Sequence, residues 1–394
     1  MAWSEGMPSP LIFRKWAAIC LVGGACERRV WTQTGPFINY LNNFVLLVAA
    51  PGIGKYIVSQ VRNLWAETLE PGGTNKAFSV APDSMSKASL MDTLAKSKKV
   101  FLPPKGSPIE YSSLLIAAEE FSVLMPGADT EYAGALNSIW NNNDYYEETR
   151  RASVVKELFI DFPQLNMLGG IQPQYLSIIA PDETWNTGLA RRMIMVYSAE
   201  QTKVNLRRDY SFRVPLRQQL LFQLGQISRL YGELNWSPEA FDKFDLWFSS
   251  EDLPPRPSHS KLEGYCNSRG QFIMKLVGIS AISRGSSEID VEDIDRAWSW
   301  LFEAEAMMPD IFRAQLGKSE AGVTEEMCLA MHKFMAEHRK SVPGELMAKF
   351  LVSRVPSYKV KSIIENAHAA GIIKLVDESL NLWQVEPKYS KMVE

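Results

Sequence analysis

The stretch NFVLLVAAPGIGKYIVSQV (residues 43–61) decides the fold of the first half of the chain. Its first part, residues 44–49, is an apolar run of the kind that forms a strand buried on both faces of a sheet. A turn with proline and two glycines follows, and residues 57–68 then have the apolar spacing of a helix. The order strand, glycine-containing turn, helix predicts an α/β domain.

The turn in this stretch carries residue types that hold phosphate groups. A Walker A loop uses backbone N–H groups next to glycines, a lysine that reaches the β- and γ-phosphates of ATP, and a hydroxyl that holds Mg²⁺. Here Ala49 replaces the first glycine, and Tyr56 replaces the serine or threonine. A working ATP site, a weakened one, and a buried turn with a solvated lysine all stay open. The candidate nucleotide-binding residues are Pro51, Gly52, Ile53, Gly54, Lys55 and Tyr56.

Further strand-like runs alternate with helical segments in the next part of the chain. The segment at residues 8–30 predicts a helix that starts after Pro10, and residues 87–96 have helical spacing. Apolar strands separated by helices predict a doubly wound sheet with helices on both faces. The additional strand-like runs lie at residues 76–81, 113–118, 164–169 and 193–198.

Two carboxylates follow the strand-like run at residues 113–118. Acids at the carboxyl end of a strand lie where open α/β sheets bind ligands. Glu119 is therefore a candidate Mg²⁺ ligand, and Glu120 a candidate general base that polarises the attacking water. The alternative is a pair of exposed acids at the start of a helix, where the helix dipole stabilises them.

Polar residues also accompany the next two strand-like runs. Gln172 closely follows residues 164–169, and its side-chain amide is placed to contact a γ-phosphate. Arg191 and Arg192 come just before residues 193–198. A guanidinium supplied to a neighbouring subunit can neutralise the charge of the transition state. A surface salt bridge is the alternative for either arginine.

The composition is that of an ordinary globular protein. The chain has 394 residues, a length that is enough for two or three domains. Of these residues, 46% are hydrophobic and 22% are charged. A net charge of −3 provides no overall basic field, so contact with nucleic acid depends on local patches. The four scattered cysteines fit a reducing cytoplasm better than a zinc site or a disulfide framework. The apolar run at residues 16–26 is too short to span a membrane, and we expect no membrane partner.

The strand signal stops at residue 214. Residues 214–316 predict a helical domain, with a break rich in proline and serine at residues 251–260. A linker is expected at residues 316–322. Three helices and a small hairpin follow, and this order predicts a winged helix-turn-helix domain at residues 320–394. The other predicted parts are an N-terminal helical segment at residues 1–30 and an α/β core at residues 31–213.

Three basic segments are candidate DNA contacts. One is the first turn of the third helix in the winged-helix domain, and the others are loops at residues 96–108 and 145–156. A solvated charged loop explains each of the two loops equally well, and a winged helix can serve protein contacts instead of DNA. The candidate residues are Tyr358, Lys359 and Lys361, then Lys98, Lys99 and Lys105, and finally Arg150 and Arg151.

The order of these motifs resembles that of a known family. The segments SPLIFRKW, ERRVW, VLLVAAPGIGKY, LLIAAEEF, NMLGGIQP and GLARRMIMVY look like those of phage and plasmid P-loop ATPases, often described as a domain of unknown function beside primases. Those proteins are similar to ring-forming AAA+ and superfamily III helicases. The resemblance covers residues 9–300, and each motif is loose, so the order carries the specificity.

The resemblance implies a replication motor that assembles as a ring, taken as a hexamer, with ATP and Mg²⁺ at the subunit interfaces. Lys55 then holds phosphate, Glu119 and Glu120 are the Walker B acids, Gln172 is the sensor, and Arg191 is favoured as the arginine finger. The helical region with Arg269 and Lys275 would be a lid over the ATPase core. The implied partners are single-stranded or forked DNA and a primase or another replication protein.

Two functions therefore stand as hypotheses. The first is an ATP-dependent DNA helicase or translocase of phage-type replication. The second is a nucleotide-gated DNA-binding adaptor, such as a helicase loader or replication initiator, in which Tyr56 slows turnover. DNA-stimulated ATP hydrolysis with strand separation distinguishes the first from the second.

Overall fold

The chain forms two compact units, Met1–Pro309 and Asp310–Glu394. The predicted lid at residues 214–316 lies mostly within the first unit, and its status as a separate domain stays a prediction. Among the described residues, no helix combines the length and the apolar character needed to cross a membrane. The computed structural model describes residues 1–103, 106–125, 127, 129–141, 144–150, 157–179, 188–249, 256–257, 259–316, 320–355 and 357–386, without the side chains of 177, 178, 315, 316 and 358.

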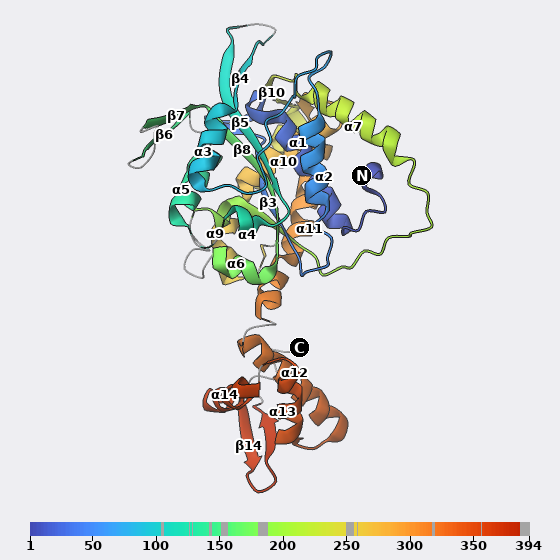
Figure 1. The fold of residues 1–394 in the computed structure, drawn as a ribbon, viewed down its shortest axis with the longest axis vertical. Helices are drawn as coiled ribbons and strands as arrows, with labels where there is room; N and C mark the ends of the chain where they lie inside the picture. Colours follow the sequence, from blue (N-terminus) through green and yellow to red (C-terminus); the bar gives the residue numbers. More distant parts are fainter. Residues whose placement is uncertain are drawn as a thin grey trace. The chain divides into compact units, whose positions relative to one another are not determined.

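A five-stranded sheet forms the centre of the first unit (Figure 1). Four strands are parallel to one another, and β4 pairs antiparallel with β5 at one edge. The predicted runs at residues 44–49, 113–118, 164–169 and 193–198 are confirmed as strands, and so is the mixed α/β class. In the sheet order, the strands are β4 (Lys98–Phe101), β5 (Ile109–Ala118), β8 (Pro163–Ile171), β3 (Phe44–Val48) and β9 (Met193–Tyr197).

The strand predicted at residues 76–81 is wrong. This segment has only two isolated bridges, Leu69 with Lys76 and Val80 with Leu115. Pro82 follows it directly and has no N–H group to extend a ladder. The segment's contact with β5 is limited to the hydrogen bonds that Ser79 and Ala81 make with Leu115, which is too short a ladder for a strand.

Helices cover both faces of the sheet. Figure 1 shows α1 (Leu11–Cys26) and α2 (Ile57–Glu67) on one side, and α3 (Lys87–Lys96) and α5 (Thr130–Trp140) on the other. The helices predicted at residues 57–68 and 87–96 are thereby confirmed. The helix predicted at residues 8–30 is confirmed over Leu11–Cys26, and a 3-10 turn (Glu27–Arg29) follows it. Helix α2 buries Ile57, Val61, Leu64 and other apolar residues at helical spacing, so one face of it packs inward.

Two antiparallel hairpins that the sequence did not predict extend this core. Strands β6 (Tyr145–Thr149) and β7 (Glu157–Asp161) form an arm that protrudes in Figure 1. Strands β1 (Val30–Thr34) and β2 (Phe37–Tyr40) form the second hairpin, and β10 (Gly232–Glu233) pairs with β1 in parallel. The short helices α4 (Phe121–Leu124) and α6 (Pro173–Ile179) follow β5 and β8.

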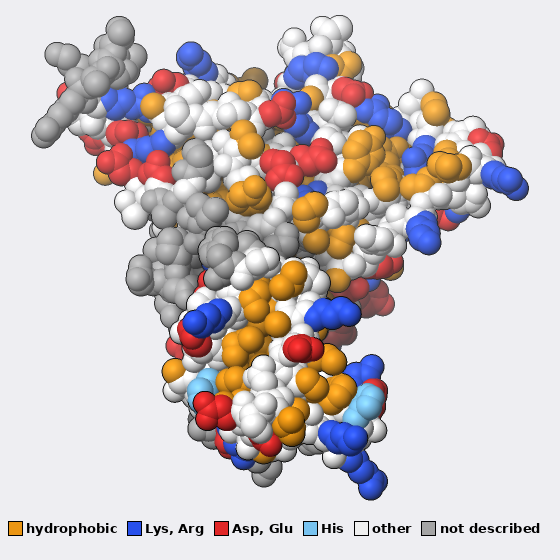
Figure 2. All heavy atoms as spheres, turned by 60° about the horizontal axis from the view of Figure 1, so that its bottom comes forward, with side chains coloured by type: hydrophobic (Ala, Val, Ile, Leu, Met, Phe, Trp, Pro, Cys, Tyr) orange, Lys and Arg blue, Asp and Glu red, His pale blue; other side chains and the backbone are white. Residues whose placement is uncertain are grey.

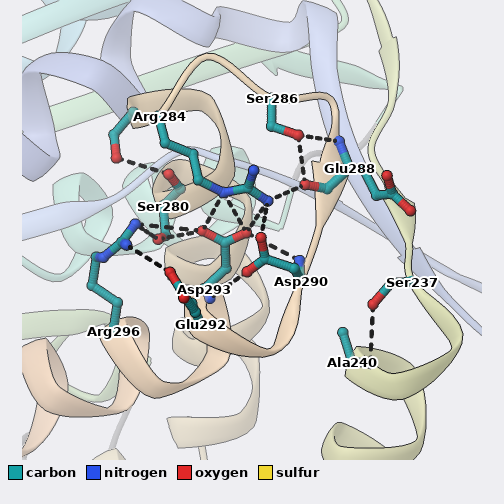
Figure 3. A network of polar contacts seen from close by, with 11 residues as sticks. Ser237, Ala240, Ser280, Arg284, Ser286, Glu288, Asp290, Glu292, Asp293 and Arg296 are labelled. Carbon is teal, nitrogen blue, oxygen red and sulfur yellow. Dashed lines mark hydrogen bonds and ion pairs between the residues drawn. The ribbon is translucent and has the colours of Figure 1, made fainter.

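The chain after β9 is mainly helical, as predicted, with β11 (Asn235–Trp236) paired to β12 (Glu288–Ile289). A polar network centred on Asp293 joins two of its helices (Figure 3). The inaccessible carboxylate of Asp293 accepts hydrogen bonds from Arg284 and Ser280. Burial acts to raise the pKa of Asp293, but these hydrogen bonds lower it overall, so the carboxylate stays charged. The helices are α7 (Arg213–Ile227), α8 (Pro238–Ser249), α9 (Glu263–Cys266), α10 (Arg269–Ser283) and α11 (Val291–Leu316).

The second unit has its own apolar core, which includes Met327, Leu351, Ile363 and Ile373. Three helices precede a hairpin, as predicted, and a short additional strand makes the sheet three-stranded in the order β13-β15-β14. Figure 2 shows apolar side chains on one face of this unit, with acidic and basic side chains around them. The elements are α12 (Glu320–His338), β13 (Val342–Pro343), α13 (Gly344–Val352), α14 (Ser357–Ala369), β14 (Ile373–Asp377) and β15 (Leu382–Val385).

Candidate functional site

The residues of the phosphate-loop motif directly follow β3. The N–H group of Ile53 donates to the carbonyl of Ala50 and closes a tight turn. Within this turn Gly52 has φ +82°, a left-handed conformation that glycine adopts without strain. Helix α2 then begins, with Tyr56 as its N-cap residue. The loop therefore brings the N-terminus of a helix, with its unpaired N–H groups, to the carboxyl end of a central strand.

The side chain of Lys55 lies across β8 and is only 7% exposed. Glycine at position 170 leaves the necessary space. A Cβ atom on Gly170 would lie 3.0 Å from Cδ of Lys55 and 2.3 Å from the backbone oxygen of Glu119. Burial lowers the pKa of Lys55, while the carboxylates of Glu120 and Glu119 oppose the shift. The ammonium group is therefore buried near the end of β5, where the charges of the two acids act on it.

The other candidate residues lie at the same edge of the sheet. The register pairs Val48 with Ile171 and Ala118 with Gly169, so β3, β5 and β8 end side by side. Glu119 and Glu120 are exposed at the end of β5. Gln172 follows β8, and its Oε1 accepts a hydrogen bond from Nε2 of Gln174 at 2.7 Å. The structure thus brings together a buried ammonium, two carboxylates and an amide where α/β sheets bind ligands.

These groups fit a nucleotide with Mg²⁺. The helix N-terminus and the ammonium of Lys55 suit phosphate oxygens, since both offer positive charge and N–H donors. The carboxylate of Glu119 suits Mg²⁺, either directly or through one of the waters that this ion retains. Glu120 is exposed and can act on a water molecule.

The N-terminal segment lies directly against the loop, a contact that the sequence did not predict. A Cβ atom on Gly54 would lie 1.3 Å from the carbonyl oxygen of Pro8. Glycine is therefore required at position 54 for the approach of the chain's own backbone, in addition to any ligand. Pro8 and Ser9 therefore lie against the loop at Gly54.

Arg191 lies at the opposite end of the sheet from Lys55. Strand β9 is parallel to β3 and pairs Met193 with Phe44, so the turn η4 (Ala190–Arg192) precedes the amino end of β9. The five-residue strand β3, which is roughly 16 Å long, separates the level of η4 from the phosphate loop. Arg191 is therefore too far away to contact a phosphate held by Lys55 of the same chain.

The two neighbouring arginines differ in their contacts. Arg192 donates hydrogen bonds to Gly188, Asn137 and Asn141, and its guanidinium lies 5.6 Å from the ring centre of Trp140. It therefore has a structural role within its own chain. The side chain of Arg191 has no hydrogen bond or ion pair with any residue that the structure describes. Of the pair, Arg191 is the one without such contacts among the described residues.

Several predicted DNA contacts are already paired within the chain. Lys99 Nζ lies 2.6 Å from Glu27, and Arg150 is buried with its Nη1 2.6 Å from Asp92. Lys98 pairs with Glu110, and Lys359 pairs with Glu320, at partly exposed positions. Lys361 is 85% exposed. Lys105 and Arg151 lie outside the described residues, as does the side chain of Tyr358.

These contacts bear on the predicted DNA surface. A DNA phosphate would have to displace the buried carboxylate of Glu27 to bind Lys99, and it would have to reach a buried guanidinium to bind Arg150. Breaking such a pair is costly. We therefore leave these two residues out of the proposed DNA surface. The exposed cations Lys98, Lys359 and Lys361 stay predictions.

Gly170 gives a direct test of this geometry. We expect Gly170→Ala to lower ATP hydrolysis by about tenfold to a hundredfold, because the new methyl group displaces Lys55 and the end of β5. Phosphate release measures the loss of hydrolysis, and a separate melting curve shows whether the variant is still folded. Gly134→Ala is the matched control, since a Cβ atom there meets nothing within 4 Å. Unchanged hydrolysis in folded Gly170→Ala protein would contradict the proposed path of Lys55.

Comparisons with known proteins add little to this geometry. No protein-family model matches the chain, and no curated protein matches it. Among solved structures, it is similar to a full-length MCM homologue from Methanopyrus kandleri, with 14% identity and a TM-score of 0.42. The match covers 77% of this chain and 57% of that one, so this chain spans little more than half of its length. A likeness at this level carries no argument about function.

Proposed function

We propose that this chain is an ATPase whose site is the sheet edge formed by β3, β5 and β8. The observation that carries the proposal is the position of Lys55, which is buried over Gly170 near the end of β5, where Glu119 and Glu120 follow. A lysine next to a helix N-terminus suits a triphosphate, and nearby acids suit Mg²⁺ and a water nucleophile. A solvated lysine after a structural turn would not need this burial.

Each residue has a role in the proposal. Lys55 and the loop bind the phosphates, Glu119 holds Mg²⁺, Glu120 orients and deprotonates water, and Gln172 contacts the γ-phosphate. Arg191 acts on the site of a neighbouring subunit, because it lies a full strand length from its own. That role requires an oligomer, and we propose a closed ring such as a hexamer, with residues 214–316 as a lid.

We further propose that the ATPase is a helicase or translocase acting on single-stranded or forked DNA during replication. The second unit supports DNA binding, since the order of three helices and the strand order β13-β15-β14 suit a winged helix-turn-helix. The predicted recognition helix is α14, where Lys359 and Lys361 lie in the first turns. A primase or another replication protein is the proposed partner.

One observation favours a second function, a nucleotide-gated helicase loader or replication initiator. Tyr56 stands where a short hydroxyl normally ligates Mg²⁺, and its ring is exposed at the start of α2. A phenol oxygen lies several ångströms farther from the backbone than a serine hydroxyl, so it cannot take that position. Mg²⁺ would then rely on Glu119 and water, which favours binding with slow turnover.

Activity with and without DNA distinguishes the two functions. ATP hydrolysis would be measured with and without single-stranded DNA, together with unwinding of a forked duplex and the mass of the assembly with a nonhydrolysable ATP analogue. Hydrolysis that DNA stimulates, with strand separation, supports the motor. Assembly that depends on nucleotide, without unwinding, supports the adaptor. No nucleotide binding under any of these conditions would contradict both.

Tyr56→Thr tests whether the loop is a weakened ATP site. We expect the variant to raise basal ATP hydrolysis several-fold, because threonine restores the short Mg²⁺ ligand. Tyr56→Phe is the control, and it should leave the basal rate unchanged. Lower activity of Tyr56→Thr in a folded and assembled protein would instead give Tyr56 a role of its own, such as stacking on the nucleotide.

A further inference from the structure

A second polar cleft lies at the amino end of β3 and β9, away from the phosphate loop. Its volume is about 770 Å³, which is the size of a small-molecule site. It is bordered by the β1–β2 hairpin, η4, the end of α8, and the segment from α9 into α10. Its described lining contains no aspartate or glutamate. Five basic residues line it, namely Arg191, Arg192, Arg256, Arg269 and Lys275.

The floor of the cleft holds a buried ammonium group without a counter-charge among the described residues. Lys275 is 2% exposed, its Nζ donates to Oδ1 of Asn42 at 2.6 Å, and it lies 4.0 Å from the ring centre of Trp140. Within the described residues, it has no carboxylate partner. Burial and the charge of Arg192 lower the pKa of Lys275 to about 7. A buried ammonium without a counter-charge costs stability, so an anionic ligand would relieve it.

The other cations of the cleft divide into two groups. Arg269 is neutralised by Glu305, with two hydrogen bonds of 2.8 Å. Arg191, Arg192 and Arg256 have no carboxylate partner in the part of the chain that the structure describes, and they share the lining with Lys275. Because Arg191 is assigned above to the site of a neighbouring subunit, Arg192, Arg256 and Lys275 are left to attract an anion with several charges.

The rim of the cleft is aromatic. Phe37 is 68% exposed and Phe248 is 58% exposed, although both are apolar, and Trp247 lies next to Phe248 in the lining. Exposed rings above a cationic floor suit a ligand with a flat base and phosphate groups. The bounded cleft suits one such unit better than a strand, which needs a continuous groove.

We propose that this cleft binds a nucleoside polyphosphate, with its phosphates on Arg192, Arg256 and Lys275 and its base against the aromatic rim. This site is separate from the phosphate loop, because the two lie at opposite ends of β3. It does not depend on ATP hydrolysis.

The test is binding of a fluorescent ATP analogue to the full chain without Mg²⁺, in a Lys55→Ala background. We expect measurable binding there, and we expect Lys275→Met to weaken it at least about tenfold, because it removes one charge-assisted contact. Lys243→Met is the matched control, since Lys243 also belongs to this helical region but pairs with Asp295 outside the described lining. A higher melting temperature for Lys275→Met would show that its weaker binding is not caused by unfolding.

Three results would overturn the proposal. The first is no binding in the Lys55→Ala background, which would leave the phosphate loop as the nucleotide site of the chain. The second is binding that Lys275→Met leaves unchanged. The third concerns a single-stranded oligonucleotide. If it binds, if Lys275→Met abolishes that binding, and if the ATP analogue does not compete with it, the cleft serves nucleic acid instead. Absence of hydrolysis in the wild type would contradict the proposed ATPase alone.

Discussion

Lys55→Ala is expected to lose ATP hydrolysis by about a hundredfold or more while the chain stays folded. The ammonium of Lys55 is the buried positive charge at the edge of β3, β5 and β8, and a preorganised charge of this kind stabilises the transition state of phosphoryl transfer. Its removal leaves the loop glycines in place. It also removes a partly desolvated charge, so a large loss of stability is not expected.

Phosphate release with saturating ATP and Mg²⁺ measures this loss, and circular dichroism with a melting curve checks the fold. Lys15→Ala is the matched control, because Lys15 pairs with Glu303 at a partly exposed position. It should keep wild-type turnover. Wild-type turnover in Lys55→Ala itself would remove the phosphate loop from the account.

Arg191→Ala is expected to lose hydrolysis by about a thousandfold, the range that arginine fingers contribute. It should recover part of that activity when mixed with Lys55→Ala subunits. Arg191 is a strand length away from its own loop and has no partner among the described residues. In a mixed ring, an intact loop from one variant can meet an intact arginine from the other.

The control for this complementation is a chain with both substitutions. Arg191→Ala mixed with the double variant must stay inactive, because no subunit then supplies the arginine. Arg192→Ala is expected to lower the melting temperature instead, since Arg192 bonds Asn137, Asn141 and Gly188. If Arg191→Ala is inactive and never complemented in mixed assemblies, Arg191 does not act between subunits.

The central strands were predictable because burial on both faces produces continuous apolar runs. Strands β3 and β8 are buried at every residue, and both were predicted. The β6–β7 hairpin was not, because exposed residues alternate with more buried ones in both strands and both carry charges. The segment at residues 76–81 looked like a strand, but it pairs with β5 only around Leu115, and local pattern does not reveal how far such pairing extends.

The candidate site divides in the same way. Lys55, Glu119 and Gln172 were predicted as site residues because they follow strands whose carboxyl ends meet at one edge. The contribution of Gly170 depends on how closely β5 and Lys55 cross β8, although two adjacent glycines inside a strand are a signal of such an approach. The approach of Pro8 to Gly54 depends on long-range packing, and no sequence signal announces it.

The cleft around Lys275 was also beyond sequence pattern. Lys275 lies in the apolar helix α10, and its isolation from carboxylates follows only from the packing of α10 against Asn42 and Trp140. The family resemblance placed Lys275 in a lid over the ATPase core, and it predicted no ligand that Lys275 itself would bind.

A structure determined with a nonhydrolysable ATP analogue and Mg²⁺ tests the central claim most directly. The proposed function predicts the triphosphate on the loop from Pro51 to Tyr56, with Lys55 on its β- and γ-phosphates and Mg²⁺ beside Glu119. A loop without nucleotide at saturating analogue, with Pro8 and Ser9 still against Gly54, would contradict it. The loop would then be a structural turn that receives the N-terminal segment.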